Sequence, residues 1–198
     1  MSEFKKIQDP LSKFPEGYKR NNPNILKHVV ERIENGDPFH YLFTGVVGCG
    51  KTHLASNIVR CTQQRWELIK VIKFYEKYLN IMTSGFSDKW SAIGQLNSIM
   101  NSTLLVVDDL GDEKPSTVAA HDYFSNLIEL RHQYIYKNPE CRTIITTNLN
   151  ANQIIETYSS RVMDRLQEYF VICKFNKTSF REKNLVILES KPLTSHIK

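Results

Sequence analysis

The residues with the clearest chemistry form one short glycine-rich segment, Gly45-Val46-Val47-Gly48-Cys49-Gly50-Lys51-Thr52. This segment matches the pattern G-x-x-x-x-G-K-[ST] at each fixed position. Glycines let a backbone fold around a phosphate so that successive N–H groups point at it, and a helix that begins at Lys51 adds its positive dipole end. In this pattern the lysine contacts the β and γ phosphates, and the threonine hydroxyl binds Mg²⁺. We therefore expect residues 45–52, with His53 beside them, to bind a nucleoside triphosphate, and a glycine-rich turn without a ligand is the alternative.

Acidic and amide side chains follow two further apolar runs. Asp108 and Asp109 come directly after Leu104–Val107, and Asn148 follows residues 142–146. The carboxyl ends of parallel strands meet at the edge of the sheet where open α/β folds bind ligands, so these groups are expected beside the glycine-rich loop. Asp108 is a candidate Mg²⁺ ligand, Asp109 would orient or deprotonate the attacking water, and Asn148 would hydrogen-bond that water or the γ-phosphate. Ordinary polar turns are the alternative for both sites.

Three arginines are candidates for a cation that acts on phosphate. Arg161 and Arg165 are four residues apart and share one face of a predicted helix, while Arg181 follows the last apolar run. A guanidinium stabilises charge on a transferring phosphoryl group, in the same subunit or from a neighbour. Surface ion pairs, for instance with Asp164 or Glu168, are the alternative for the first two arginines.

Apolar runs and periodic segments alternate along the chain. Asn22 and Pro23 are typical of a helix start, and Asn35-Gly36 is typical of its end. The runs predict strands at Phe39–Thr44, Leu68–Phe74, Thr103–Val107, Arg142–Thr146 and Phe170–Phe175. The periodic segments predict helices at Lys51–Gln63, Tyr75–Thr83, Asp88–Met100, Val118–Lys137 and Asn152–Tyr169. This order predicts an α/β fold with a parallel β-sheet flanked by helices on both faces.

The length of 198 residues suggests one domain with short appendages. We expect an N-terminal arm at 1–22, a core at 23–181 and a short C-terminal tail at 182–198. The sequence has no run of about 18 apolar residues, and its first residues lack the apolar core of a signal peptide, so we expect no membrane span. The widely spaced Cys49, Cys61, Cys141 and Cys173 favour reduced thiols in a cytoplasmic protein and argue against a zinc site.

The charge balance leaves a nucleic-acid partner open. The chain carries 26 basic and 21 acidic residues, a net charge of +5. This excess permits binding to nucleic acid without requiring it.

Taken together, the motifs resemble the AAA+ ATPase core, and more narrowly the branch of DnaC- and DnaI-type helicase loaders and IstB-type transposition ATPases. The resemblance rests on the glycine-rich segment, on LLVVDDLG at Leu104–Gly111, on TIITTNLN at the end of Leu127–Asn150, on RVMDR at Arg161–Arg165 and on SFR at Ser179–Arg181. It runs in one order over about four fifths of the chain and implies a P-loop NTPase fold.

The resemblance also implies roles for these residues. Lys51 and Thr52 hold phosphate and Mg²⁺, Asp108 and Asp109 are the Walker-B pair, and Asn148 is the sensor-1 residue. Arg165 is the first candidate and Arg161 the second for an arginine finger that acts on the neighbouring subunit's ATP. Arg181 looks like a sensor-2 residue of the same subunit. Such ATPases form rings or open helices in the ATP state, through head-to-tail interfaces.

The sequence departs from the usual pattern in three ways. Asp109 stands where most AAA+ proteins carry glutamate and is one methylene shorter, which affects water positioning. Residues 1–22 are too few for the folded helicase-binding domain of full-length loaders. Only 33 residues follow Arg165, so any helical lid is minimal or absent.

The implied partners are single-stranded DNA and a hexameric replicative helicase. Basic and aromatic residues in and after the second predicted strand suit binding to single-stranded DNA, because phosphates pair with lysine and bases stack on rings. They are Lys70, Lys73, Lys77, Phe86, Lys89 and Trp90. A core role for Phe86 and Trp90 is the alternative. The functional alternatives are a transposition helper that binds duplex DNA and a transposase, and a weakly hydrolysing regulator of a host helicase loader.

Overall fold

A computed structural model describes residues 16, 23–35, 40–62, 66–70, 93–94, 97–112, 118–138 and 141–175. Its centre is a five-stranded sheet in the order β2-β3-β4-β1-β5. The strands are β1 (His40–Gly45), β2 (Trp66–Lys70), β3 (Leu104–Leu110), β4 (Arg142–Thr147) and β5 (Val171–Phe175). All neighbouring pairs are parallel, as the sequence predicts.

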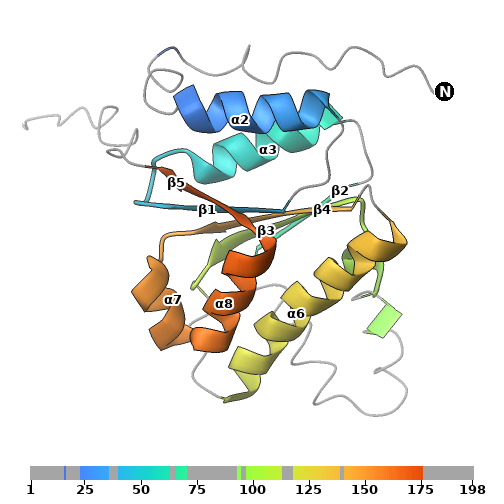
Figure 1. Ribbon diagram of the computed structural model, residues 1–198, viewed down its shortest axis with the longest axis vertical. Coiled ribbons are helices and arrows are strands. Elements are labelled where there is room, and N and C mark those ends of the chain that lie inside the picture. Colours follow the sequence, from blue (N-terminus) through green and yellow to red (C-terminus); the bar gives the residue numbers. More distant parts are fainter. Residues whose placement is uncertain are drawn as a thin grey trace, which may run out of the picture.

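Helices cover both faces of this sheet (Figure 1). On one face lie α2 (Pro23–Glu34) and α3 (Lys51–Thr62), and on the other lie α6 (Val118–Lys137), α7 (Ala151–Thr157) and α8 (Ser160–Tyr169). Two hydrophobic clusters fill the two layers: Ile144 belongs to the cluster on the α3 side and Ile145 to the cluster on the α6 side. Successive strand residues point to opposite faces, so a segment buried on both faces is largely apolar, as Leu104–Val107 of β3 is.

The predicted single helix over Asn152–Tyr169 is wrong, because the chain breaks there into α7 and α8. Ser159 has φ 152° and its hydroxyl caps α8 by accepting from the Val162 amide at 3.4 Å. Tyr158 is fully buried, with its ring 5.2 Å from that of Phe124. A serine that bonds its own backbone favours a helix start over a helix interior, and that preference ends the periodic run.

Two strand boundaries also differ from the prediction. β3 continues past Val107 to Leu110, so Asp108 and Asp109 lie on the strand and not after it. β2 begins at Trp66, before the predicted Leu68. The remaining described ends agree within about one residue, and the predicted helix Val118–Lys137 has those bounds in the structure.

Several predictions fall on residues that the structure does not describe. They are the end of the strand at 71–74, the helix at 75–83, most of the helix at 88–100, Arg181, most of the arm at 1–22 and the tail at 182–198. Within the second of these helices, residues 93–94 and 97–100 are helical. None of the helices in the described ranges is long and apolar enough to span a bilayer.

Candidate phosphate-binding site

The glycine-rich loop connects the end of β1 to the first turn of α3. Gly45, Gly48 and Gly50 have φ values of 150°, 79° and 98°, which residues other than glycine rarely adopt. At Gly45 a Cβ atom would also lie 2.6 Å from the Phe175 carbonyl oxygen, because β5 runs alongside. Sequence and packing therefore both require glycine where the strand turns into the loop.

Lys51 is folded into this loop and is 5 % exposed. Its Nζ donates to the carbonyl oxygens of Gly45 at 2.7 Å and Val46 at 2.9 Å, and lies 3.6 Å from the Cys49 sulfur. The same Nζ also donates to Asn148 Oδ1 at 2.9 Å. An ammonium group has three protons, so Lys51 joins the loop to the end of β4 with its full donor capacity.

The acidic part of the site lies on β3, next to the same helix. Thr52 Oγ1 donates to Asp108 Oδ1 at 2.8 Å, and Asp108 is 2 % exposed. A threonine hydroxyl that donates its proton keeps oxygen lone pairs for a metal. Hydroxyl and carboxylate oxygens are ligands that Mg²⁺ prefers, usually one or two of them together with phosphate oxygens. Thr52 and Asp108 therefore have the chemistry to hold Mg²⁺.

Asp109 and Asn148 flank this pair. Asp109 is half-buried and has φ 62°, a left-handed conformation. Asn148 is exposed at the end of β4, the strand between β3 and β1. Because the strands are parallel, the loop, both aspartates and Asn148 meet at one edge of the sheet, as the sequence predicts.

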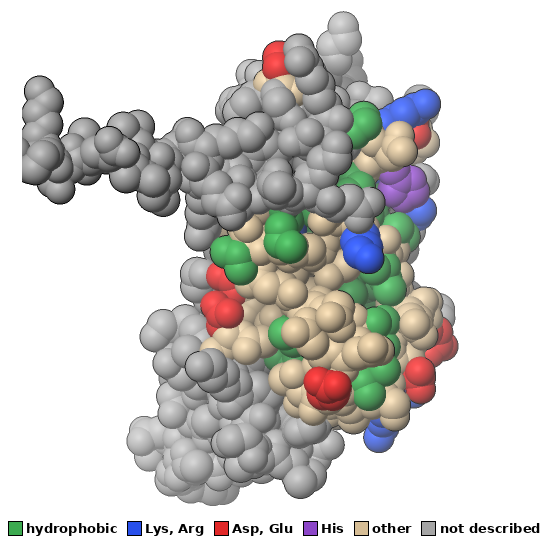
Figure 2. Space-filling view, turned by 90° about the vertical axis from the view of Figure 1, so that its left-hand side faces the viewer, with side chains coloured by type: hydrophobic (Ala, Val, Ile, Leu, Met, Phe, Trp, Pro, Cys, Tyr) green, Lys and Arg blue, Asp and Glu red, His purple; other side chains and the backbone are tan. Residues whose placement is uncertain are grey.

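The outer part of the site is exposed. Val46 and Val47 in the loop are 55 % and 56 % exposed, and His53 is exposed in the first turn of α3. Figure 2 looks onto this edge of the sheet, where hydrophobic side chains lie at the surface close to acidic ones. The described part of the chain holds no group of three or more His, Cys, Asp or Glu side chains that could bind a metal by themselves.

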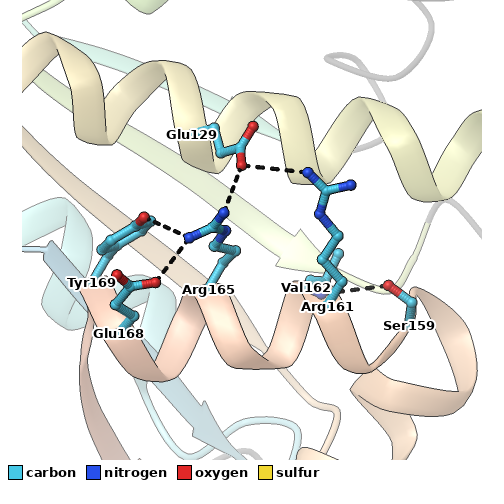
Figure 3. Close-up of polar contacts among 7 residues, drawn as sticks. All are labelled: Glu129, Ser159, Arg161, Val162, Arg165, Glu168 and Tyr169. Atoms are coloured by element: carbon cyan, nitrogen blue, oxygen red, sulfur yellow. Dashed lines mark hydrogen bonds and ion pairs between the residues drawn. The ribbon is translucent and has the colours of Figure 1, made fainter.

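Arg161 and Arg165 lie on α8 and point toward α6 (Figure 3). Arg165 pairs with Glu129 at 3.1 Å and Glu168 at 2.9 Å, and donates to the Tyr169 hydroxyl at 2.8 Å. Arg161 pairs with Glu129 at 3.5 Å, and its side chain is 69 % exposed. The hydrogen bond to Glu168, followed by the charge of Tyr169, raises the pKa of Arg165. Within one chain, the partners described for both arginines lie on α6 and α8 and not at the glycine-rich loop.

Two residues of this region are missing from the sequence-based candidates. Glu129 lies on α6, far in the sequence from the arginines that it pairs with. Thr146 lies on β4, and its hydroxyl contacts both Asp108 and the Asp109 amide. The run of hydroxyl residues before Asn148 is the sequence feature that could have indicated Thr146. The predicted DNA-facing residues lie outside the described residues, except for Lys70, which ends β2.

The sequence is similar to known proteins over most of its length. The family model described as "ATPase family associated with various cellular activities (AAA)" matches residues 41–173. The replicative helicase loader DnaC of Escherichia coli K12 is 28 % identical over 166 residues, which span 81 % of this chain and 64 % of that protein. The chain thus spans less than two thirds of the length of this relative.

Solved structures show the same fold. A crystal structure of the DnaC helicase loader superposes with a TM-score of 0.61 and 22 % identity, and covers 82 % of this chain and 100 % of that one. AMPPCP-bound DnaA from Aquifex aeolicus superposes with a TM-score of 0.63 and 18 % identity, over 91 % of this chain and 55 % of that one.

Proposed function

The chain belongs to the ATPase family associated with various cellular activities, and from this premise we propose that it is an ATP-hydrolysing DNA replication factor. Its specific task in this proposal is to help place a hexameric replicative helicase on single-stranded DNA in the cytoplasm. The observation that carries the proposal is the convergence of Lys51, Asn148, Thr52 and Asp108. Two hydrogen bonds, of 2.9 Å and 2.8 Å, join these residues, which come from three separate segments.

The proposed mechanism assigns a task to each residue of the site. The loop amides and Lys51 bind the phosphates, while Thr52 and Asp108 hold Mg²⁺, which neutralises charge on the β and γ phosphates. Asp109 orients the attacking water and Asn148 contacts that water or the γ-phosphate. Residues 45–53 as a whole form the nucleotide cradle.

Hydrolysis is completed between subunits in this proposal. Arg165, with Arg161 as the second candidate, acts on the ATP of the adjoining subunit, and Arg181 acts on the ATP of its own. A residue supplied by a neighbour makes hydrolysis depend on assembly, so ATP binding favours a homo-oligomer. The support for this step is that both arginines lie on α8 and that their described partners belong to α6 and α8 (Figure 3).

The helicase and DNA partners are proposed from the likeness to DnaC, a replicative helicase loader. We propose that the arm at 1–22 or the surface of the core docks the helicase. The second candidate is a transposition helper, which differs in its preference for duplex DNA and a transposase. The third candidate, for which the short Asp109 side chain leaves room, is a regulator of a host loader that hydrolyses ATP weakly.

The test measures ATP hydrolysis and helicase capture with the same preparation. Wild-type chain should hydrolyse ATP with single-stranded DNA present and retain a hexameric replicative helicase in an ATP-dependent manner. Lys51→Ala is the matched control, since it removes the cation but not the loop. Absence of saturable ATP binding by wild type contradicts the proposal. Binding without turnover favours the regulator, and ATP-dependent filaments on duplex DNA alone favour the transposition helper.

A further inference from the structure

The buried hydroxyl of Thr146 joins both Walker-B aspartates. We propose that Thr146 is a positioning residue for ATP hydrolysis, which orients the Asp108 carboxylate for Mg²⁺ and fixes the backbone that carries Asp109. The inference rests on the proposed ATPase function. It adds a residue that the glycine-rich loop, the aspartates and the arginines do not include.

Both hydrogen-bonding capacities of this hydroxyl are in use. Thr146 is fully buried, its Oγ1 donates to Asp108 Oδ1 at 2.7 Å, and the same oxygen accepts from the Asp109 amide at 3.0 Å. The single hydroxyl proton is therefore committed to Asp108, and a lone pair is committed to the backbone of Asp109. The rotation of this side chain is fixed by two partners, of which one accepts a hydrogen bond and the other donates one.

Asp108 Oδ1 accepts from two threonines that come from different elements. Thr52 of α3 reaches it at 2.8 Å and Thr146 of β4 at 2.7 Å. One hydroxyl belongs to the proposed metal site, and the other belongs to the sheet beneath it. A carboxylate oxygen held between two donors has little freedom to rotate, which is the usual function of an outer contact to a metal ligand.

The backbone explains why the sheet needs this contact. Val107 pairs with Ile145 and Leu110 pairs with Thr147, so β3 has one residue more than β4 in this interval. A bulge of this kind redirects side chains and interrupts the backbone ladder. Thr146 faces the bulge, and its side chain binds the Asp109 amide there. It thereby stabilises the left-handed Asp109, whose φ is 62°.

The two residues after Thr146 also connect the end of β4 to other parts of the site. Thr147, the next residue, donates to the Leu110 carbonyl oxygen at 2.7 Å, and Asn148 accepts from Lys51 at 2.9 Å. The last two residues of β4 and the residue after it thus contact the acidic strand and the phosphate-binding lysine. Of these three contacts, only the one from Thr146 reaches a carboxylate.

The experiment compares variants that lack the hydroxyl with one that retains it. Thr146→Val and Thr146→Ala lack it, and the alanine supplies the test if the valine prevents folding. Thr146→Ser retains it. Thr143→Val is the matched control, because Thr143 is equally buried on the same strand but accepts from Arg131 Nε at 3.1 Å. We measure kcat, the Mg²⁺ concentration for half-maximal rate, and the affinity for ADP without metal.

The hydroxyl-free variants should lose about 10-fold or more in kcat and require more Mg²⁺, as outer contacts of metal sites do. Their ADP affinity without metal should stay within about 2-fold of wild type, and Thr146→Ser should recover most of the rate. Thr143→Val should reduce the melting temperature without changing the Mg²⁺ requirement. Wild-type kcat and Mg²⁺ requirement in the hydroxyl-free variants, or equal loss in the serine variant, overturns the role of Thr146. A wild-type chain without any hydrolysis overturns the proposed function as well.

Discussion

Glu129 of α6 and Arg165 of α8 form an ion pair of 3.1 Å between two helices on the same face of the sheet (Figure 3). The same carboxylate oxygen also pairs with Arg161 at 3.5 Å. Both side chains of the shorter pair are about one-third exposed, at 28 % and 31 %, so solvent screens the pair and its share of folding stability is small. Its consequence is geometric, since it fixes where the guanidinium lies on the surface.

The first prediction concerns the arginine that acts between subunits. Arg165→Ala should lower the ATPase rate of the assembled oligomer by on the order of 10³-fold, because the cation that stabilises the transferring phosphoryl group is lost. Binding of ATP to the isolated subunit should remain. Arg161→Ala, on the same face of α8, is the matched control and should retain most of the rate.

A mixing experiment separates this effect from misfolding. Arg165→Ala subunits have an intact nucleotide site, while Asp109→Asn subunits have an intact Arg165. Mixed oligomers should recover part of the rate, since an Asp109→Asn neighbour supplies the missing arginine. If mixing recovers nothing, or if Arg161→Ala causes the larger loss, Arg165 is not the residue supplied in trans.

Local chemistry explains which parts of the site the sequence could predict. The glycine spacing of residues 45–52 and the following helix are encoded in consecutive residues. The contact between Asn148 and Lys51 follows from the parallel order of the strands, because β4 lies between β3 and β1. Both features needed only the fold class and the ends of the strands.

Other features depend on packing that a sequence pattern does not contain. Thr146 and Thr147 are adjacent and alike, and the bulge in β3 decides which of them faces Asp108. The pairing of Glu129 with Arg165 depends on how α6 packs on α8. The break at Ser159 interrupts an apolar period that continues on both sides of it, so periodicity alone predicts one helix.

The second prediction concerns a buried cation that supports the sheet. Arg131 is fully buried, and its guanidinium donates to the carbonyl oxygens of Met100, Ser102 and Arg142. Hydrogen bonds to a charged group contribute about 1.5–3 kcal/mol each. Arg131→Met leaves these three carbonyl oxygens and the Thr143 hydroxyl without this donor, and should reduce the free energy of unfolding by about 3 kcal/mol or more.

The measurement is a thermal or urea unfolding curve. For a chain of this size, a loss of about 3 kcal/mol corresponds to a decrease of about 6–12 °C in melting temperature. Arg161→Met makes the same chemical change at a side chain that is 69 % exposed, and should stay within about 0.5 kcal/mol of wild type. Equal effects of the two substitutions would show that the buried contacts of Arg131 contribute little.

The third prediction is a pH dependence of stability that comes from His40. This residue begins β1 with 5 % exposure, and its ring stacks on Phe170 at 5.0 Å. Burial, followed by the charges of Arg131 and His132, lowers the pKa of His40 from 6.5 to about 3. The folded chain therefore keeps this ring neutral at pH values where the unfolded chain protonates it.

The direction of this pH dependence follows from proton linkage. Between pH 6.5 and 3 the unfolded state binds more protons at His40, so stability decreases as the pH falls through this window. From pH 7.5 to 5 the contribution amounts to about 2 kcal/mol. Urea unfolding at both pH values should show this loss in wild type and a smaller loss in His40→Phe, which keeps a stacking ring and does not titrate. Equal losses in the two proteins would assign the pH dependence to other groups.

The last prediction uses the conformation of Asp109 to separate chemistry from folding. Asparagine tolerates a φ near 62° about as well as aspartate does, whereas alanine does not. Asp109→Asn therefore keeps the backbone and removes the charge that would orient or deprotonate water. We expect ATP affinity and melting temperature near wild type and a decrease in kcat of roughly 100-fold or more, the range for a lost general base. Asp109→Ala should lose kcat and also stability, through strain in the left-handed region. If Asp109→Asn hydrolyses ATP at the wild-type rate, the water is activated by another group, and Asp109 serves the bulge in β3 alone.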